Sequence, residues 1–372
     1  MTDDTLSMLA DASSAFAVFD GKRVRALRGS DNGFDRGRWH AIAEQGWLAV
    51  LTPESRGGPG LGAAAANVIA RRLGYALFPE PFVACGVMAS VCIAETESGS
   101  ANDARLARVL SGQTVAALAW QDDAGGLELA PPVQASEGPS GTTLNGASRF
   151  VPVPADAYIV AARSAAGVAL YWVDSTAKGI GLEREPRADG GSSIRLRLHD
   201  VRVAAGDRIA APPVGARALQ RAIDTAIAAT GAELVGLAER MLEMTLEYLR
   251  TRQQFGKPIG SFQALQHRAV DLWIQGELAK AAVAAAERVL EDSSAAPVAR
   301  SLAASSAKAR AAEAALTIGK QAIQLHGAIG MTDEYDLALY FNRALTLSAW
   351  MGNAAEHRRR YAALRDAIGE VV

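Results

Sequence analysis

Residues 252–271 carry the side chains and backbone best suited to bind an anion. Gly256 and Pro258 break the apolar pattern there, which predicts that one helix ends near Arg252 and a second opens near Ser261. An arginine at such a bend can hold a phosphate in bidentate fashion, and the free N–H groups of the second helix favour the same ligand. We expect a pyrophosphate site here, with Ser261 as the helix cap. The local alternative is an ordinary helical hairpin with a surface arginine.

The chain contains three regions with different sequence patterns, and the elements they form must position this turn. Residues 1–115 are typical of helices, residues 116–210 of a small antiparallel β domain, and residues 211–372 of long, alanine-rich helices. The predicted class is α+β, mostly α, with an N-terminal helical domain, a central β-sandwich or barrel and a C-terminal four-helix bundle. The bundle helices are expected at 218–252, 262–290, 297–324 and 335–365, with an interruption near Gly352. Strands are expected at 115–120, 142–145, 157–162, 168–173 and 194–198.

Composition excludes several classes of function. The net charge of −2 and pI of about 6.3 give no nucleic-acid footprint. No apolar run reaches the ~18–20 residues of a membrane span, and the acidic N-terminus has no signal-peptide pattern, so we expect a cytoplasmic protein. Cys85 and Cys92 lie two helical turns apart, about 10 Å, which predicts core thiols rather than a disulfide. No pair of His or Cys residues has an Asp or Glu nearby at the spacing that metal ligands require, so no metal site is expected.

Three motifs together resemble those of acyl-CoA dehydrogenases. They are Arg252-Gln253-Gln254-Phe255-Gly256 followed by Phe262-Gln263, Gln324-Leu325-His326-Gly327-Ala328-Ile329-Gly330, and Gly46-Trp47 with Pro53-Glu54 and Gly57-Gly58. The resemblance covers essentially the full length and includes the order of the three domains. It implies FAD-dependent α,β-dehydrogenation of an acyl-CoA thioester, in fatty acid or steroid catabolism.

By this resemblance, six residues would hold the diphosphate and adenosine end of a neighbouring subunit's FAD. We call them the grip residues: Arg252, Gln254, Phe255, Gln263, Gln324 and Gly327. The segments that would support the chain's own isoalloxazine, here called the flavin bed, depart from the family pattern. Residues 119–123 read Ala-Trp-Gln-Asp-Asp in place of a Thr-Glu-Pro turn, and 150–152 read Phe-Val-Pro in place of Trp-Ile-Thr. Pro152 has no N–H to donate, although Phe150 can stack on a ring.

The family's catalytic glutamate is also missing from both places where relatives carry it. Met351 and Ala226 occupy these positions, and neither can take a proton. Asp224 points about 200° away from Ala226 on a helix. Glu356 and His357 lie one turn past Met351 and are possible substitutes, but a solvated charged helix is the simpler interpretation of 356–360. We therefore assign no catalytic residue to this chain.

Two histidines have competing interpretations. His326 lies inside the Gln-x-x-Gly motif and so is expected near the adenosine end of the cofactor, where packing or backbone hydrogen bonding is its simplest role. His267 is expected to be a plain surface or core histidine. Charged residues in the segment 333–343 are expected to form ion pairs that hold the turn after His326 against the bundle.

An intact grip beside an altered bed and a missing base resembles the small subunit of heteromeric acyl-CoA dehydrogenases, such as those for pimeloyl-CoA or steroid side chains. The expected partners are an acyl-CoA, a related subunit in an α2β2 assembly and electron-transferring flavoprotein. The alternatives are a self-sufficient homotetramer with an unusual base, such as Glu356, or a monooxygenase or desulfinase-like flavoenzyme on the same fold. A scaffold without cofactor contact is the non-enzymatic alternative.

Overall fold

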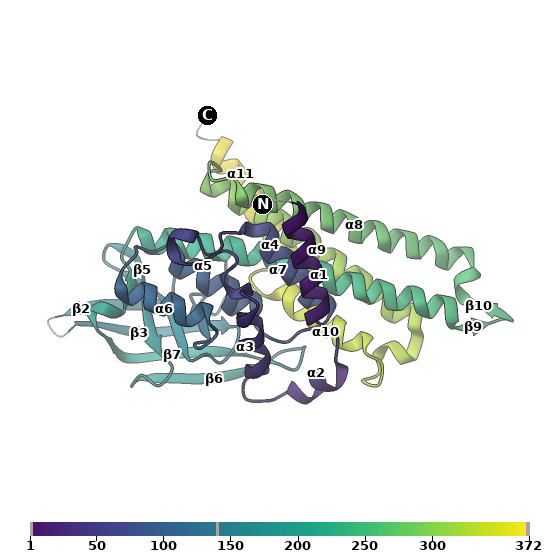
Figure 1. Cartoon of the computed structure of the whole chain (residues 1–372), viewed down its shortest axis with the longest axis horizontal. Coiled ribbons are helices and arrows are strands. Elements are labelled where there is room, and N and C mark those ends of the chain that lie inside the picture. Colours follow the sequence, from purple (N-terminus) through teal and green to yellow (C-terminus); the bar gives the residue numbers. More distant parts are fainter. Residues whose placement is uncertain (1–2, 139–140, 370–372) are drawn as a thin grey trace. The chain divides into compact units, whose positions relative to one another are not determined.

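The computed structural model describes residues 3–138 and 141–369 (Figure 1). These residues form two compact units. One contains residues up to 25, 67–78 and 227 onward, and the other contains 26–66 and 79–226. The long helix α7 (Val214–Thr251) begins in the second unit and continues in the first. The boundaries predicted at 115/116 and 210/211 remain predictions about domain organisation.

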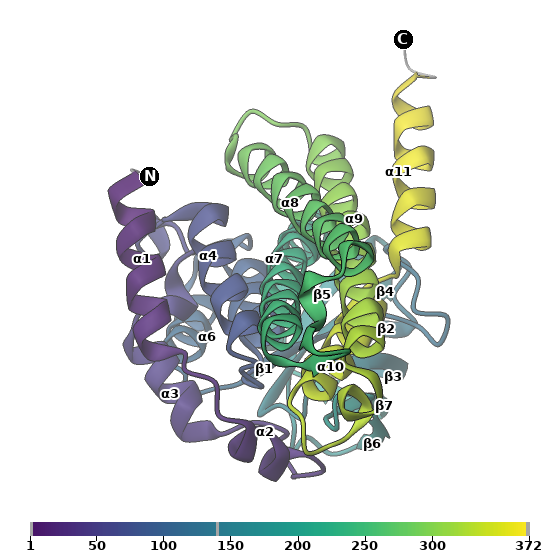
Figure 2. The same ribbon diagram turned by 90° about the vertical axis from the view of Figure 1, so that its right-hand side faces the viewer.

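The bundle unit is built on long, alanine-rich helices. Its elements are α1 (Asp3–Phe16), α8 (Gln263–Glu291), α9 (Pro297–His326), η6 (Gly327–Met331), α10 (Leu337–Ala349) and α11 (Ala354–Gly369), most of α4 (Gly62–Tyr75) and the later part of α7. Helices α8 and α9 lie side by side, and α10 and α11 pack on α9 (Figure 2). Pro297 starts α9 at N1, where its missing N–H costs nothing. The interruption predicted near Gly352 is confirmed between α10 and α11.

The other unit contains a sheet of eight described strands in the order β6-β7-β3-β2-β4-β5-β8, with β1 beside β4. Their bounds are β1 (Ala116–Ala119), β2 (Val133–Gly138), β3 (Gly141–Val151), β4 (Ala157–Ser164), β5 (Gly167–Asp174), β6 (Ile180–Pro186), β7 (Ser192–Val203) and β8 (Arg208–Ala210). The pairing is mostly antiparallel, but β1 and β2 each run parallel to β4. The helices of this unit are α3 (Arg36–Glu44), α5 (Met88–Ala94), α6 (Ser100–Leu110) and the π-helix η3 (Phe82–Val87), with short turns η1 (Trp47–Ala49), η2 (Glu54–Arg56) and η4 (Ala205–Asp207). Helix α2 (Gly21–Leu27) begins in the bundle unit, and its residues from 26 onward belong to this unit.

The mostly helical α+β architecture is confirmed, and each predicted strand overlaps an observed one. In β7 the predicted alternation holds, with Ile194, Leu196 and Leu198 buried. Strands β2 and β6 were missed because their largely exposed residues carry no apolar period. Cys85 and Cys92 are buried free thiols, as expected, and burial raises the pKa of Cys92 to about 12. None of the described helices is long and apolar enough to cross a membrane.

Candidate functional site

The turn after α7 forms a small, exposed hairpin at one end of the bundle (Figure 1). Helix α7 ends at Thr251, as predicted, and β9 (Gln253–Gln254) pairs with β10 (Lys257–Pro258). The N–H of Arg252 donates to the Tyr248 carbonyl at 2.8 Å, and the Ile259 N–H donates to the Arg252 carbonyl at 2.8 Å. These two bonds fix the backbone of Arg252 at the base of the hairpin.

Ser261 does not cap α8, so this prediction is wrong. It belongs to the short turn η5 (Ile259–Ser261), and its hydroxyl donates to the Pro258 carbonyl at 2.7 Å. Phe262 occupies the N-cap position instead, without a side-chain hydrogen bond. The first N–H groups of α8 therefore have no side-chain acceptor at the cap, and Gln263 is the first helical residue.

The side chains of the polar grip residues are exposed to solvent. No described residue makes a hydrogen bond or ion pair with the side chains of Arg252, Gln254, Gln263 or Gln324, and all four side chains are exposed. Phe255 is 91% exposed although its backbone has the left-handed φ of 54°, which is costly for a residue with a Cβ. An uncommon backbone conformation that displays an apolar ring to solvent is typical of a contact residue.

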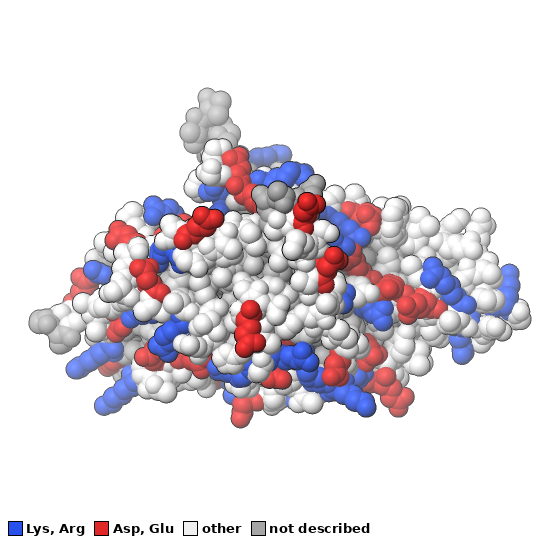
Figure 3. Space-filling view, viewed as in Figure 1, with Lys and Arg blue, Asp and Glu red and all other residues white. Residues whose placement is uncertain are grey.

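Two glycines leave open space beside these side chains. Gly256 and Gly327 have φ values of +78° and +67°, and a Cβ built on either would meet no heavy atom within 4 Å. Gly327 ends α9 as its C-cap. The donor set and the open backbone therefore fit the diphosphate end of a dinucleotide. In Figure 3, lysine and arginine side chains lie among mostly uncharged surface at this end of the bundle.

His326 connects the two segments that carry the grip residues. Its ring is stacked on Tyr248 of α7, with 4.4 Å between centroids and 29° between planes. Its Nδ1 lies 2.8 Å from the Ala322 carbonyl and its Nε2 lies 3.1 Å from the Tyr335 hydroxyl. The side chain is buried, and burial lowers its pKa. These contacts agree with the role in packing and backbone hydrogen bonding that was predicted for His326. His267 lies on the surface.

The loop after His326 is held by ion pairs, in line with the sequence expectation. Arg25 pairs with Asp336 at 2.8 Å and with Asp333 at 3.5 Å. Arg343 pairs with the buried Glu233 of α7 at 2.7 Å. The described residues contain no group of three or more His, Cys, Asp and Glu that could hold a metal.

A row of large apolar side chains is exposed on α8. Val270, Trp273, Ile274 and Leu278 are 54%, 56%, 42% and 50% exposed. They recur at helical spacing and therefore lie on one face. We call them the α8 stripe. An exposed apolar row of this size, on the helix that begins with the grip residue Gln263, indicates a protein contact.

In the sheet unit, the first segment of the flavin bed is closed by its own hydrogen bonds. The buried Gln121 donates through Nε2 to the Gly125 carbonyl at 2.8 Å and to the Gly126 carbonyl at 3.2 Å. The backbone carbonyl of Gln121 accepts from the Ser148 hydroxyl at 3.0 Å and from the Arg149 N–H at 2.9 Å. The side chain of Gln121 thus has no free donor for a ligand.

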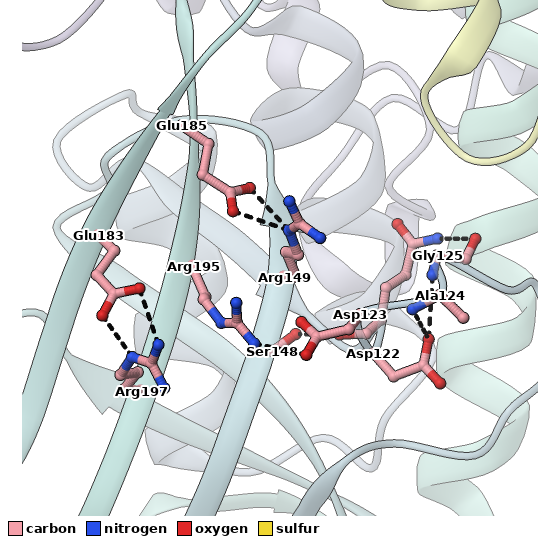
Figure 4. A network of polar contacts seen from close by, with 11 residues as sticks. Asp122, Asp123, Ala124, Gly125, Ser148, Arg149, Glu183, Glu185, Arg195 and Arg197 are labelled. Atoms are coloured by element: carbon pink, nitrogen blue, oxygen red, sulfur yellow. Dashed lines mark hydrogen bonds and ion pairs between the residues drawn. The ribbon is translucent and has the colours of Figure 1, made fainter.

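Hydrogen bonds and one ion pair fix the same loop against the sheet, and a second ion pair joins β3 to β6 (Figure 4). Asp122 accepts from the N–H groups of Ala124 and Gly125 at 3.0 and 3.1 Å. Asp123 pairs with Arg195 at 2.5 Å, and Arg149 pairs with Glu185 at 2.8 Å. These contacts hold the loop in one defined position on the sheet.

The second segment of the bed is occupied in the same way. A Cβ on Gly125 would lie 3.1–3.7 Å from ring atoms of Phe150, so the loop already packs on this ring. The Arg149 guanidinium lies 4.8 Å from the centre of the same ring. The Pro152 carbonyl accepts from Arg187 at 2.6 Å, and proline supplies no N–H. At position 152 the backbone therefore has no N–H group to offer the edge of a flavin.

Neither expected position for a base carries an acid. Ala226 is fully buried, and the nearby Asp224 accepts from Gln220 at 2.9 Å. Met351 is buried with φ of 55° in the turn between α10 and α11. Glu356 accepts from the Asn353 N–H at 2.6 Å, and Asn353 in turn accepts from the Glu356 N–H at 3.1 Å. These reciprocal bonds cap the start of α11 and hold the Glu356 carboxylate.

Two buried basic side chains hold the turn that contains Met351. Lys308 of α9 is fully buried, and its ammonium donates to the carbonyls of Trp350 at 2.9 Å, Gly352 at 3.1 Å and Ser348 at 3.5 Å. His357 is also fully buried, with Nε2 2.9 Å from the Met351 carbonyl. Burial lowers the pKa of Lys308 to about 7, and burial together with the charges of Lys308 and Arg360 lowers that of His357 to about 3.

The sequence interpretation missed both roles. It placed His357 on a solvated helix, which is wrong because the imidazole lies inside the unit. It did not single out Lys308, although a signal was present: this lysine falls on the buried stripe of α9 together with Ala304, Ala311 and Ala315. A single lysine on the apolar face of an alanine-rich helix must find carbonyl or carboxylate partners.

Comparison with known proteins places this arrangement in a family. Residues 3–113 match the model "Acyl-CoA dehydrogenase, N-terminal domain", and residues 214–364 match "Acyl-CoA dehydrogenase, C-terminal domain". Acyl-CoA dehydrogenase IpdE2 of Mycobacterium tuberculosis is 32% identical over 86% of this chain and 84% of its own length. The chain belongs to the acyl-CoA dehydrogenase family. It is therefore related to flavoprotein oxidoreductases that act on CH–CH bonds.

Solved acyl-CoA dehydrogenase structures have the same fold. The ChsE4-ChsE5 complex from Mycobacterium tuberculosis contains a chain that is 28% identical, with a TM-score of 0.86 over 98% of this chain and 97% of that one. The Tcur3481-Tcur3483 steroid acyl-CoA dehydrogenase G363A variant is 28% identical, with a TM-score of 0.87 over 99% of both chains. Each of these solved structures carries two joined protein names, and the first is described as a complex.

Proposed function

We propose that this chain is the cofactor-gripping subunit of a heteromeric, FAD-dependent acyl-CoA dehydrogenase. In this assembly its grip residues hold the diphosphate and adenosine end of FAD, and a related subunit supplies the catalytic glutamate. The observation that carries the proposal is the contrast between two sites in one chain. The polar grip side chains are exposed and have no hydrogen-bond or ion-pair partner among the described residues, whereas the residues of the flavin bed bond and pair with their own neighbours.

The chemistry assigned to this chain is binding and orientation. Desaturation of an acyl-CoA removes a proton from Cα and a hydride from Cβ, and a bound flavin supplies the electron acceptor. Arg252 would donate charge-assisted hydrogen bonds, each contributing about 1.5–3 kcal/mol to affinity. Gln254, Gln263 and Gln324 would add neutral hydrogen bonds, and Phe255 would pack against the nucleotide or the neighbouring subunit. No residue of this chain is assigned to proton abstraction.

The α8 stripe supports an obligate partner. Leaving Trp273 and its neighbours in water forgoes about 25 cal/mol for each Å² of apolar surface that a partner would cover. We infer an α2β2 assembly with a related chain, by analogy with relatives named as pairs. By the same analogy we propose a bulky, steroid-derived acyl-CoA as substrate. Cytoplasmic location and transfer of electrons to electron-transferring flavoprotein complete the proposal.

The test compares the chain alone with the assembled enzyme. We expect the chain expressed alone to purify without a stoichiometric flavin absorbance band. We expect the complex, captured from its host through a tag on this chain, to be yellow and to contain a second acyl-CoA dehydrogenase chain in its native mass spectrum. A flavin-saturated homotetramer formed by this chain alone would refute the proposal.

A pair of arginine variants tests the grip itself. Arg252→Ala in the complex should weaken FAD binding by about tenfold to a hundredfold, which corresponds to loss of one charge-assisted interaction. Arg359→Ala is the matched control, since Arg359 is an exposed arginine of α11 outside the grip. Equal FAD affinity in both variants would favour a scaffold that does not contact the cofactor.

A further inference from the structure

Three aromatic rings link the separate segments on which the grip residues lie. Tyr248 lies one turn before Arg252 on α7, His326 is the last residue of α9, and Tyr335 precedes α10. The His326 ring has centroid distances of 4.4 Å to Tyr248 and 5.0 Å to Tyr335. The three rings form a continuous contact from the end of α7 to the loop after η6.

The first and the middle ring of this row, Tyr248 and His326, are each tied to a grip segment. The Tyr248 carbonyl accepts from the Arg252 N–H at 2.8 Å, so a shift of Tyr248 moves the base of the hairpin. On the other side, the η6 turn folds tightly against His326, because a Cβ on Gly330 would lie only 3.0 Å from the His326 Cβ. Gln324 and Gly327 flank His326 in the chain. The imidazole therefore contacts Tyr248, whose carbonyl is bonded to the Arg252 N–H, and it belongs to the residue directly before Gly327.

The hydrogen bonds of His326 determine how the ring is oriented. The Ala322 carbonyl can only accept, so Nδ1 carries the proton. In the neutral ring Nε2 then accepts from the Tyr335 hydroxyl at 3.1 Å. With both nitrogens bonded and only 4% of the residue exposed, the ring has one orientation.

We propose that His326 is a positioning residue that sets the distance between the Arg252 hairpin and the Gln324–Gly327 turn, and so determines how tightly this chain holds the adenosine diphosphate half of FAD. The inference rests on the proposed function. It assigns no contact between the imidazole and the cofactor. A small displacement of one segment would prevent the two sets of donors from binding the same nucleotide together.

The test uses two substitutions that separate the ring from its hydrogen bonds. His326→Asn retains a donor near the Ala322 carbonyl but removes the ring that contacts Tyr248. His326→Phe retains the ring and removes both hydrogen bonds. In the complex stripped of cofactor, titration with FAD should give a dissociation constant about tenfold higher for His326→Asn, with most of the affinity restored in His326→Phe. The visible circular dichroism of the bound flavin should change in the Asn variant alone.

The outcomes separate this inference from the proposed function. If Arg252→Ala weakens FAD binding but His326→Asn does not, the positioning role is refuted and the grip stands. If Arg252→Ala has no effect either, the proposed function itself fails. A purely structural role predicts equal loss of thermal stability and of affinity in the Asn and Phe variants, which would also refute positioning. Tyr335→Phe, which only removes a hydroxyl, provides a well-folded variant and should weaken FAD binding less than His326→Asn.

Discussion

Lys308→Met is the perturbation whose magnitude follows most directly from the structure. The ammonium of Lys308 is fully buried and makes two close bonds, at 2.9 Å to the Trp350 carbonyl and 3.1 Å to the Gly352 carbonyl. A buried carbonyl left without a donor costs about 1–3 kcal/mol. Removing a buried charge that has no contacting carboxylate returns part of this cost. We expect a net loss of about 3 kcal/mol in the free energy of unfolding, or ~6–12 °C in Tm.

The pH dependence of this loss has a defined sign. Burial lowers the pKa of Lys308 from its ordinary value of 10.5 to about 7. Between these values the unfolded chain binds more protons at this residue than the folded chain, so the contribution of Lys308 to stability becomes more favourable as pH rises from about 7 to 10.5. The stability difference between wild type and Lys308→Met should therefore widen between neutral and alkaline pH.

The assay is thermal and chemical unfolding followed by far-ultraviolet circular dichroism at several pH values. Lys320→Met is the matched control, because Lys320 is an exposed lysine on the same helix. Equal Tm values for the two variants would show that the turn does not depend on the lysine. A difference that narrows with rising pH would refute the assignment of a depressed pKa.

Three further predictions concern the turn and the α8 stripe. Met351→Glu should give no acyl-CoA dehydrogenation in the chain alone, and substantial turnover would contradict the loss of the flavin bed. The substitution should also lower the stability of the chain, because Met351 is 2% exposed and has a φ of 55°. Glu356→Gln should cost about 0.5–1 kcal/mol in unfolding, since it weakens the cap on the Asn353 N–H, and should leave kcat of the complex unchanged; abolished turnover with flavin retained would identify Glu356 as the base. Trp273→Ser should shift the native mass of the complex toward free subunits, more than Leu278→Ser, and unchanged assembly would show that the stripe is not an interface.

The family relationship and the main helical elements could be predicted from local sequence. Gly256 and Pro258 end one helix and prevent its continuation, and Gly352 interrupts the last one, because both effects act on backbone dihedrals within a few residues. The motif around Arg252 predicted the first part of the grip for the same reason: Arg252, Gln254, Phe255 and Gln263 are close in sequence and need only a turn to bring them together. The family resemblance likewise predicted that Met351 stands where relatives carry a glutamate, since that comparison needs only residue identity.

Tertiary structure alone decided which of these side chains are free and which are engaged. Nothing near Gln121 in sequence predicts that its carbonyl will bond Ser148, and nothing near Lys308 predicts carbonyl partners at 350 and 352. Likewise, Tyr248 and Tyr335 lie on different segments from His326 and meet its ring only after the bundle packs. Hydrophobic period and turn chemistry encode local geometry, whereas burial and partner choice depend on contacts between segments far apart in the chain. The residue types of the predicted grip could therefore be read from the sequence, whereas the exposure of their side chains became apparent only in the fold.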